Sequence, residues 1–260
     1  MARLVILGSA SIVPDAEHEN THMILQGDTS SVLIDCVGTP IVRLGQAGVG
    51  IEDINHVILT HFHPDHVGAF PEMLITQWLL GRKSAMAVYG LDHCLDRVKQ
   101  LMTAYHWEDW AGFFPVTFHY LPEEEGVLVL DNEDFRITAS PVRHFIPTIG
   151  VRVLVKESGF VFAYSSDTRP CPEVVRLSHN ADLLIHEATG VEPLGHSSPA
   201  QAGAIAEEAC VKRLGLIHYP VRDTNSTILL RDARKTFSGP VFVCEDLMEI
   251  DLHRDESGQG

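Results

Sequence analysis

The sequence lacks a run of 18 apolar residues, so we expect no membrane span. It also lacks a CxxC pair. Its five cysteines are odd in number and widely spaced, which argues against a disulfide framework and favours a reducing compartment, here the cytoplasm. The N-terminal segment has a short apolar run but no A-x-A cleavage pattern, so we interpret it as a first strand rather than a signal peptide.

Basic residues are scarce. The chain has 19 Lys and Arg against 35 Asp and Glu, a formal net charge of −16. This balance disfavours a nucleic-acid partner, because such binding depends on neutralising phosphates with Lys and Arg. It does not exclude a small anionic substrate, since a metal ion can reverse the local sign of charge. Two short segments remain as candidates for a basic patch, namely Arg82-Lys83 and Arg231 with Arg234-Lys235.

The pattern of apolar residues and turn residues predicts an α/β protein forming one domain over residues 1–260. Strands are expected at Arg3–Gly8, His22–Asp28, Ser30–Cys36, His56–Thr60, Ala85–Tyr89, Asp182–Ala188, Leu214–Tyr219 and Pro240–Cys244, and through most of Val116–Thr168. Helices are expected at Pro40–Gln46, Pro71–Leu80, Leu91–Tyr105, Pro172–Ser178, Pro199–Val211 and Thr227–Phe237. These elements favour one sheet packed on another with helices outside.

Two local features refine this prediction. Ser198-x-x-Gln201 has the spacing of a capping box at the start of the helix from Pro199. The acidic end of the chain, from about Glu245 to Gly260, is expected to be partly disordered.

Three histidines and an aspartate follow the predicted strand His56–Thr60 within six residues, in the motif HxHxDH. Imidazole and carboxylate groups are common ligands of zinc and similar divalent metals. Residues two apart in an extended segment face the same side, so His61 and His63 can reach one metal ion. Asp65 and His66 lie beyond Pro64, where the chain must turn, and can face a second ion.

Further ligands must come from distant parts of the chain, because this motif supplies at most two per metal ion. His144, Asp167 and His218 each stand at or near the end of a predicted strand. If those strands share a sheet layer, their ends bring these side chains to the first motif. Asp167 could bridge both ions, since a carboxylate has two oxygens.

This pattern resembles the metallo-β-lactamase superfamily over nearly the whole chain. The resemblance implies a four-layer αββα sandwich with metal ions at one edge of the two sheets. It implies two divalent metal ions, with zinc favoured over manganese or iron. The ligands it implies are His61, His63 and His144 for one ion, and Asp65, His66 and His218 for the other, with Asp167 bridging.

The sequence is also similar to the ribonuclease Z branch of that superfamily. Four motifs recur in the order of that branch: LVILGSASIVP near the start, SSDTRP at Ser165–Pro170, HEAT at 186–189, and HSSPAQAG at His196–Gly203. The last motif of the branch, close to THFSxRY, appears here as IHYPVR, which keeps His218 and Arg222 but loses the Ser and the final Tyr.

The tRNA-processing members of the branch carry a long arm between the equivalents of His144 and Asp167. Only 22 residues lie between those positions here, and two strands with a turn would fill them. The absence of the arm disfavours tRNA as the substrate.

The expected chemistry is hydrolysis. A water that bridges two metal ions has a lowered pKa and becomes a hydroxide nucleophile near neutral pH. Asp65 is a candidate base or orienter of that water. The resemblance points to His196, supported by Glu187, as the proton donor to the leaving group. A purely structural role is the alternative for both residues.

Two other residues near these motifs are assigned less directly. Asp35, at the end of SSVLIDC, either supports a metal-bound histidine or caps a turn. His186 precedes Glu187 in a predicted strand and so faces the opposite side, which favours core packing.

The leading hypothesis is a binuclear metal-dependent phosphodiesterase that acts on a small or nucleotide-like phosphodiester. The first alternative is a tRNA 3′-end processing endoribonuclease. A further alternative is a hydrolase of a lactone, a thioester or an aryl sulfate. The last alternative is a non-catalytic binding protein; loss of metal ligands would indicate that case, and all seven predicted ligands are present. The sequence leaves a homodimer open and fixes neither the metal nor the substrate.

Overall fold

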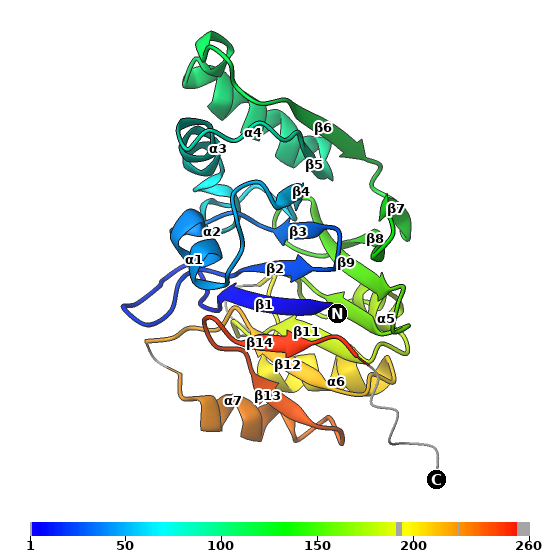
Figure 1. Cartoon of the computed structure of the whole chain (residues 1–260). Coiled ribbons are helices and arrows are strands. Elements are labelled where there is room, and N and C mark those ends of the chain that lie inside the picture. Colours follow the sequence, from blue (N-terminus) through cyan, green and yellow to red (C-terminus); the bar gives the residue numbers. More distant parts are fainter. Residues whose placement is uncertain (1, 191–193, 223, 254–260) are drawn as a thin grey trace.

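The computed structural model describes residues 2–190, 194–222 and 224–253. Within them, two mixed sheets of seven strands pack face to face (Figure 1). The first has the order β14 (Glu249–Asp251), β1 (Arg3–Gly8), β2 (His22–Gln26), β3 (Ser31–Ile34), β4 (Ile54–Ile58), β5 (Met86–Leu91) and β6 (Val116–Leu121). The second has the order β13 (Val241–Val243), β12 (Leu214–Ile217), β11 (Leu183–Glu187), β10 (Val161–Tyr164), β9 (Thr148–Val155), β8 (Phe135–Val142) and β7 (Val127–Asp131).

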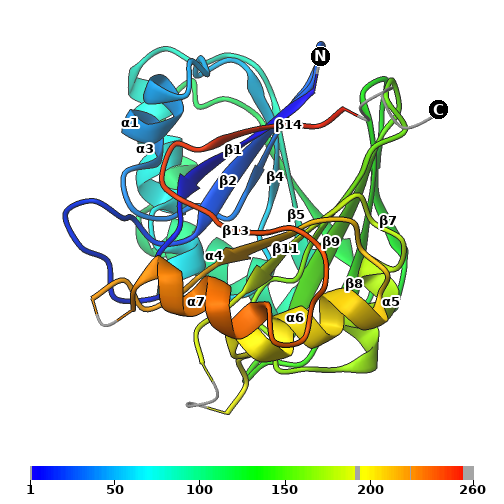
Figure 2. The same ribbon diagram turned by 90° about the horizontal axis from the view of Figure 1, so that it is seen from below.

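Helices cover the outer faces of both sheets, as the two views show (Figures 1 and 2). On the first sheet lie α1 (Pro40–Gln46), α3 (Phe70–Leu79) and α4 (Asp92–Ala104), with the short α2 (Pro64–Val67) and the 3₁₀ turn η1 (Trp107–Asp109). On the second lie α5 (Pro172–Ser178), α6 (Pro199–Glu208) and α7 (Ser226–Ala233). This arrangement is the predicted four-layer αββα sandwich.

Alternation along each strand builds three apolar layers. In β1, Leu4 and Ile6 belong to the core between the sheets, whereas Val5 and Leu7 belong to the core under the first set of helices. A third core joins the second sheet to α5, α6 and α7. Because the central strands are buried on both faces, they read in the sequence as continuous apolar runs.

The strand directions bring several loops to one edge. In the first sheet β3, β4 and β5 are parallel, and in the second β10, β11 and β12 are parallel. β8 is antiparallel to β9, which is antiparallel to β10, so β8 and β10 run the same way. His61, after β4, has its Nε2 atom 3.9 Å from Oδ2 of Asp167, after β10. The carboxyl ends of the parallel strands of both sheets therefore lie at the same edge of the sandwich.

Most predicted elements are confirmed to within a few residues, and β1, α1 and α5 have the predicted bounds. The capping box also forms: the Gln201 amide N–H donates to Ser198 Oγ at 3.2 Å, and the Ser198 amide N–H donates to Gln201 Oε1 at 2.9 Å. All five cysteines lie in the described residues and are free thiols, as expected. No helix among the described residues has the length and apolar character needed to cross a membrane.

The predicted disorder from Glu245 is wrong for Glu249–Asp251, which pair with β1 as strand β14. This pairing buries Ile250 in the core between the sheets. Residues 254–260 of the predicted tail lie outside the described residues. The single turn α2 and the turn η1 were not predicted.

Candidate metal centre

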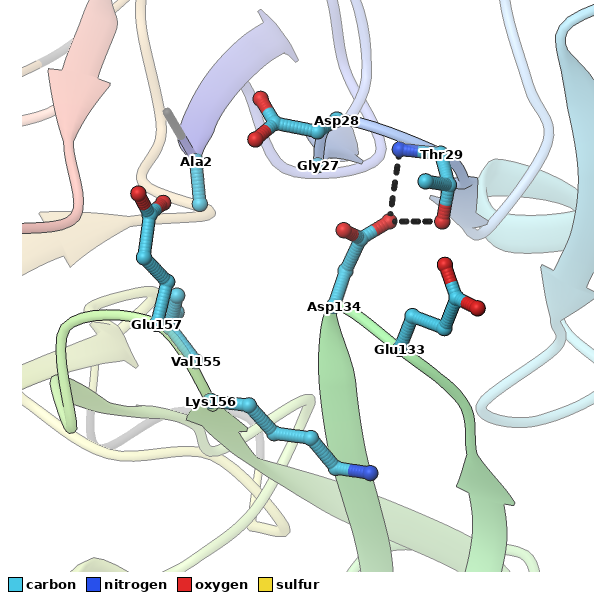
Figure 3. Close-up of a pocket in the computed structure, with 9 residues that line it drawn as sticks. All are labelled: Ala2, Gly27, Asp28, Thr29, Glu133, Asp134, Val155, Lys156 and Glu157. Atoms are coloured by element: carbon cyan, nitrogen blue, oxygen red, sulfur yellow. Dashed lines mark hydrogen bonds between the residues drawn. The ribbon is translucent and has the colours of Figure 1, made fainter.

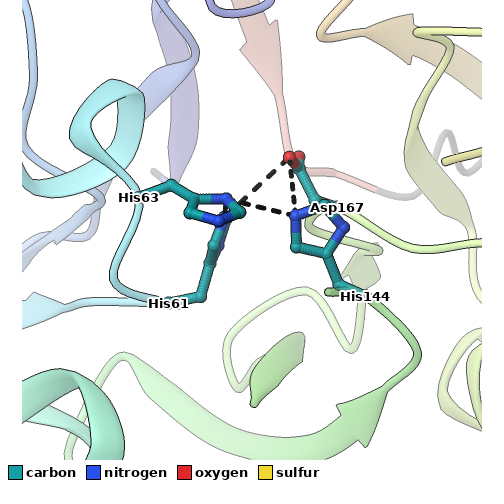
Figure 4. A group of neighbouring side chains, drawn as sticks. All are labelled: His61, His63, His144 and Asp167. Carbon is teal, nitrogen blue, oxygen red and sulfur yellow. Dashed lines mark hydrogen bonds and ion pairs between the residues drawn. The ribbon is translucent and has the colours of Figure 1, made fainter. Parts of the chain in front are cut away.

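The seven residues predicted as metal ligands come together at the shared edge of the sheets. Within one group of four, shown in Figure 4, the candidate ligand atoms all lie within 4.8 Å of one another: His61, His63, His144 and Asp167. Asp65, His66 and His218 form a second such group. A third, overlapping group consists of Asp167, His196 and His218, so the predicted proton donor also borders the cluster.

Local structure explains how one short motif faces two ways. His63 is still extended, with φ −108° and ψ 152°, and Pro64 then starts α2. Proline suits a first helical position, because its φ is already helical and it has no N–H to satisfy. The single helical turn redirects Asp65 and His66 toward the second group, and both are buried.

Two of the imidazoles are held by acceptors on the side away from the cluster. His66 Nδ1 lies 2.8 Å from Asp35 Oδ2, and His144 Nδ1 lies 3.0 Å from the carbonyl oxygen of Gly195. An acceptor at Nδ1 fixes the proton there and leaves the Nε2 lone pair facing the cluster. Asp35 therefore supports a histidine, one of its two predicted roles. It also accepts a 2.8 Å bond from the amide of Thr60, 25 residues away, which ties it to the segment after β4.

Two threonines fix the rings of His61 and His218 in the same way. Thr60 Oγ1 donates to Asp35 and lies 3.1 Å from His61 Nδ1. Thr189 Oγ1 donates to the His218 carbonyl at 2.8 Å and lies 2.8 Å from His218 Nδ1. A hydroxyl has one proton, so each oxygen that gives it to an acceptor can only accept from Nδ1–H. Sequence reasoning gave neither threonine a role.

The inward-facing atoms of the cluster crowd one another. His63 Nδ1 lies 3.1 Å from His61 Nε2 and 3.2 Å from His144 Nε2, and it can donate a proton to at most one of them. His66 Nε2 and Asp167 Oδ1 are buried and have no hydrogen-bond partner. Unpaired buried lone pairs are costly, but a cation turns each into a bond. Two nitrogens on one tetrahedral zinc ion would lie roughly 3.4 Å apart, so the residues fit a divalent metal.

The charges of the metal-free cluster support the same interpretation. Burial favours a neutral carboxyl at Asp167, yet His218, His66 and His61 hold its pKa well below the usual range. Burial also opposes a charge on His66, but Asp167 and Asp35 raise its pKa well above the usual value. Burial dominates at His61 and lowers the pKa of that ring. The surrounding histidines thus favour the charged form of Asp167.

His196 and Glu187 form a pair next to the cluster. His196 Nδ1 lies 3.1 Å from Glu187 Oε1, and this contact raises the pKa of His196 although burial opposes it. The Glu187 carboxylate is buried and accepts the amides of Ser197 at 2.8 Å and Thr189 at 2.9 Å. Glu187 therefore orients the His196 ring and also ties together the loops on either side.

His186 lies outside the cluster. It is buried on the face of β11 that alternates with that of Glu187, and its Nδ1 lies 2.8 Å from the Glu187 carbonyl oxygen. This placement confirms the prediction of core packing.

Three residues around the cluster have a left-handed backbone although none is glycine. Asp35, Ser166 and His218 have φ values of 61°, 53° and 53°. This conformation costs about 1–2 kcal/mol for an L-residue and tends to persist where surrounding contacts determine it. Each of the three follows a strand, where the chain must turn sharply to direct a side chain inward.

A residue far along the sequence fixes the loop under His218. The His218 amide donates to the Ser9 carbonyl at 2.9 Å. Asp246 Oδ1 in turn accepts both the amide of Ser9 at 2.9 Å and its hydroxyl at 2.7 Å. The other oxygen of Asp246 lies 3.0 Å from Arg43. Asp246 therefore holds the loop after β1, and the Ser9 carbonyl of that loop holds His218.

A pocket of about 480 Å³ lies at the opposite edge of the sandwich (Figure 3). It is formed where strands begin, by Ala2, the β2–β3 turn and the turns before β8 and β10. Asp134 in its wall accepts bonds from the amide and hydroxyl of Thr29 at 2.9 and 2.8 Å. The pocket contains none of the histidines or aspartates that form the cluster.

The αββα sandwich and the buried His–Asp cluster at its edge define the class of divalent-metal hydrolases. The chain belongs to the beta-lactamase superfamily, whose domain matches residues 30–219. It is a hydrolytic enzyme that binds divalent metal.

Comparison with known proteins supports a ribonuclease Z-like branch of that superfamily. The chain is 27% identical to a ribonuclease Z of Methanothermobacter thermautotrophicus, over 99% of both chains. It is 28% identical to that of Metallosphaera sedula, over 97% of this chain and 99% of the relative.

Solved structures share the fold. The metallo-beta-lactamase fold protein YhfI from Bacillus subtilis superposes with a TM-score of 0.81 and 22% identity, covering 96% of this chain and 98% of YhfI. The short form of human tRNase Z superposes with a TM-score of 0.77 and is 24% identical, covering 97% of this chain and 100% of that protein. A diphosphatase from the PhnP family superposes with a TM-score of 0.76 and is 18% identical, covering 96% of this chain and 98% of that protein.

Thr189→Val should weaken metal binding by about 10- to 100-fold, because the Nδ1–H of His218 loses its acceptor and the ring is no longer held in one tautomer. Competition against a chelator of known affinity measures the change. Thr227→Val, at an exposed position on α7, is the matched control and should bind metal as the unmodified protein does. An unchanged affinity in Thr189→Val would show that the hydroxyl does not position His218.

Proposed function

We propose that this enzyme is a binuclear metal-dependent phosphodiesterase acting on small or nucleotide-like phosphodiesters. The observation that carries the proposal is the juxtaposition of two ligand groups around Asp167 with the His196–Glu187 pair. Asp167 Oδ2 lies 3.5 Å from His66 Nε2 and 3.9 Å from His196 Nδ1. A phosphoryl group at the cluster would thus meet a proton donor within reach of its leaving oxygen.

Each group has a distinct role in this proposal. His61, His63 and His144 would hold one metal ion, Asp65, His66 and His218 would hold the other, and Asp167 would be shared. Bound metal supplies a more acidic water and neutralises charge on the phosphoryl oxygens. Asp65 Oδ2, 3.4 Å from His218 Nε2, accepts a hydrogen bond from the attacking water and orients it. Zinc suits this imidazole-rich donor set, and iron and manganese also accept it.

Proton transfer completes the reaction. The water gives one proton to Asp65 as its oxygen bonds to phosphorus, the bond to the leaving oxygen breaks, and that oxygen takes the Nε2 proton of His196. Glu187 raises the pKa of His196 against the opposing effect of burial and orients its ring before the transfer. Because Glu187 is itself held by backbone amides, the pair is preorganised rather than assembled on binding.

The surface charge argues against tRNA. Arg82, one predicted basic contact, is fully buried and donates to backbone carbonyls, including that of Ile54 at 2.7 Å. In the other predicted patch Arg231 and Lys235 both pair with Asp232, at 3.0 and 2.7 Å. Strands β9 and β10 occupy the 22 residues where a recognition arm would be inserted.

A ribonuclease Z activity is the second candidate. It is favoured by the similarity to proteins of that name over 99% of both chains. It shares the metal chemistry proposed above and differs in requiring a surface that holds tRNA.

Asp167→Ala should lose at least one of two bound metal ions, because both groups lose a shared carboxylate. Elemental analysis of protein purified without chelator measures the stoichiometry, which should be close to two in the unmodified protein. Asp109→Ala, at an exposed aspartate on η1, should keep both. Full metal content in Asp167→Ala would contradict the bridging role.

The choice between the two functions rests on substrates. The metal-loaded enzyme should hydrolyse bis-nitrophenyl phosphate and process a precursor tRNA poorly at physiological salt, because few basic groups are available to hold the phosphate backbone. Both rates are measured with the same preparation at catalytic enzyme concentrations. Efficient cleavage of the precursor just after its discriminator base would establish ribonuclease Z activity instead.

His196→Ala should slow an alkyl ester with a poor leaving group by at least about 100-fold, and a nitrophenyl ester far less. A general acid matters most when the departing oxygen needs a proton. The measurement is the kcat for each ester in His196→Ala relative to the unmodified enzyme. The loss on the nitrophenyl ester is the control for the loss on the alkyl ester. Equal losses on both substrates would show that His196 is structural.

A further inference from the structure

Phe145 places an exposed aromatic ring beside the cluster. It directly follows His144 yet is 54% exposed. The centroid of its ring lies 4.8 Å from that of His144 and 5.9 Å from that of His196, the latter edge-on at 70°. The ring thus contacts a predicted metal ligand and the proposed proton donor, while more than half of its surface remains open.

Gly195 leaves room for this ring. A Cβ atom at that residue would lie 2.9 Å from Phe145 Cζ, which is closer than real contacts allow. Gly195 also has φ +115°, a conformation that favours glycine. Its carbonyl holds His144 Nδ1. The same loop therefore positions the exposed ring, the metal ligand and, one residue later, His196.

We propose that Phe145 is a stacking platform for a planar leaving group, so that the preferred substrate is an aryl or nucleoside phosphodiester. The inference rests on the proposed function: the leaving oxygen must lie within reach of His196, so the group attached to it lies on the side where Phe145 is exposed. Aromatic rings attract one another in offset or edge-on arrangements. Stacking tolerates any base, because every base has a π-face.

The surroundings of the ring favour an uncharged planar group over a further phosphate. Arg143, the cation next to His144, is paired with Glu173 at 2.9 Å. Leu194, the residue before Gly195, is 75% exposed and is an apolar side chain of the same loop. Recognition on this side therefore depends on apolar and stacking contacts.

Kinetics with matched esters test the platform. A methyl phenyl phosphate and a methyl fluoroalkyl phosphate with a leaving group of similar acidity separate stacking from chemistry. Phe145→Ala should raise KM for the phenyl ester by about tenfold and change kcat little, because stacking holds the ground and transition states alike. The KM for the fluoroalkyl ester should rise much less. Phe145→Tyr should keep the KM for the phenyl ester near that of the unmodified enzyme. Phe145→Leu, which keeps apolar volume without a ring, should raise it as Phe145→Ala does.

A binding measurement makes the test independent of turnover. Calorimetry with the metal-loaded protein compares phenylphosphonate with methylphosphonate. Phenylphosphonate should bind more tightly, and Phe145→Ala should abolish most of that preference. Leu79→Ala, at another exposed apolar position, should retain it.

The outcomes separate the two proposals. Equal losses for both esters and no phenyl preference in binding would overturn the platform and leave the phosphodiesterase proposal intact. Hydrolysis of neither ester by the unmodified enzyme, with the phenyl preference present and lost in Phe145→Ala, would overturn the proposed function and retain the platform for a different ester. A drop in metal content in Phe145→Ala alone would show that the ring only supports His144 and would overturn the inference.

Discussion

The structure depends on one electrostatic constraint, which is that a buried space holds several imidazole nitrogens and two carboxylates directed at one another. Without a cation these atoms cannot all be satisfied, as the contacts of His63 with His61 and His144 show. The two sheets hold the groups in place from strand ends. Partners on the outer side of four rings, those of His61, His66, His144 and His218, prevent these side chains from turning away. Affinity for metal is therefore built into the fold before any ion binds.

Much of this centre could be predicted from the sequence, because its parts have local signatures. The HxHxDH motif is dense in ligand types, and His144, Asp167 and His218 stand close to the ends of recognisable strands. Their juxtaposition could be inferred because parallel strands end at a common edge. The fold was predictable for the same reason, since buried strands and capped helices have clear apolar patterns.

The supporting contacts could not be predicted, because they join residues without a shared pattern. Thr60 and Thr189 act through hydroxyl groups that are common throughout any sequence, and Gly195 acts through its backbone carbonyl. Strand β14 has three residues with two charges among them, too short and too polar to show alternation. Its burial follows from pairing with β1, which is a tertiary effect.

The bond network of Asp246 has a consequence for the order of events during synthesis. Every residue of the two ligand groups lies at or before His218 in the chain, yet the loop beneath His218 is fixed through Ser9 by a residue 28 positions later. A nascent chain that ends before Asp246 carries all the ligands but lacks the contact that closes their geometry. The complete geometry of the cluster therefore requires a chain that extends through Asp246, a residue that contributes no ligand.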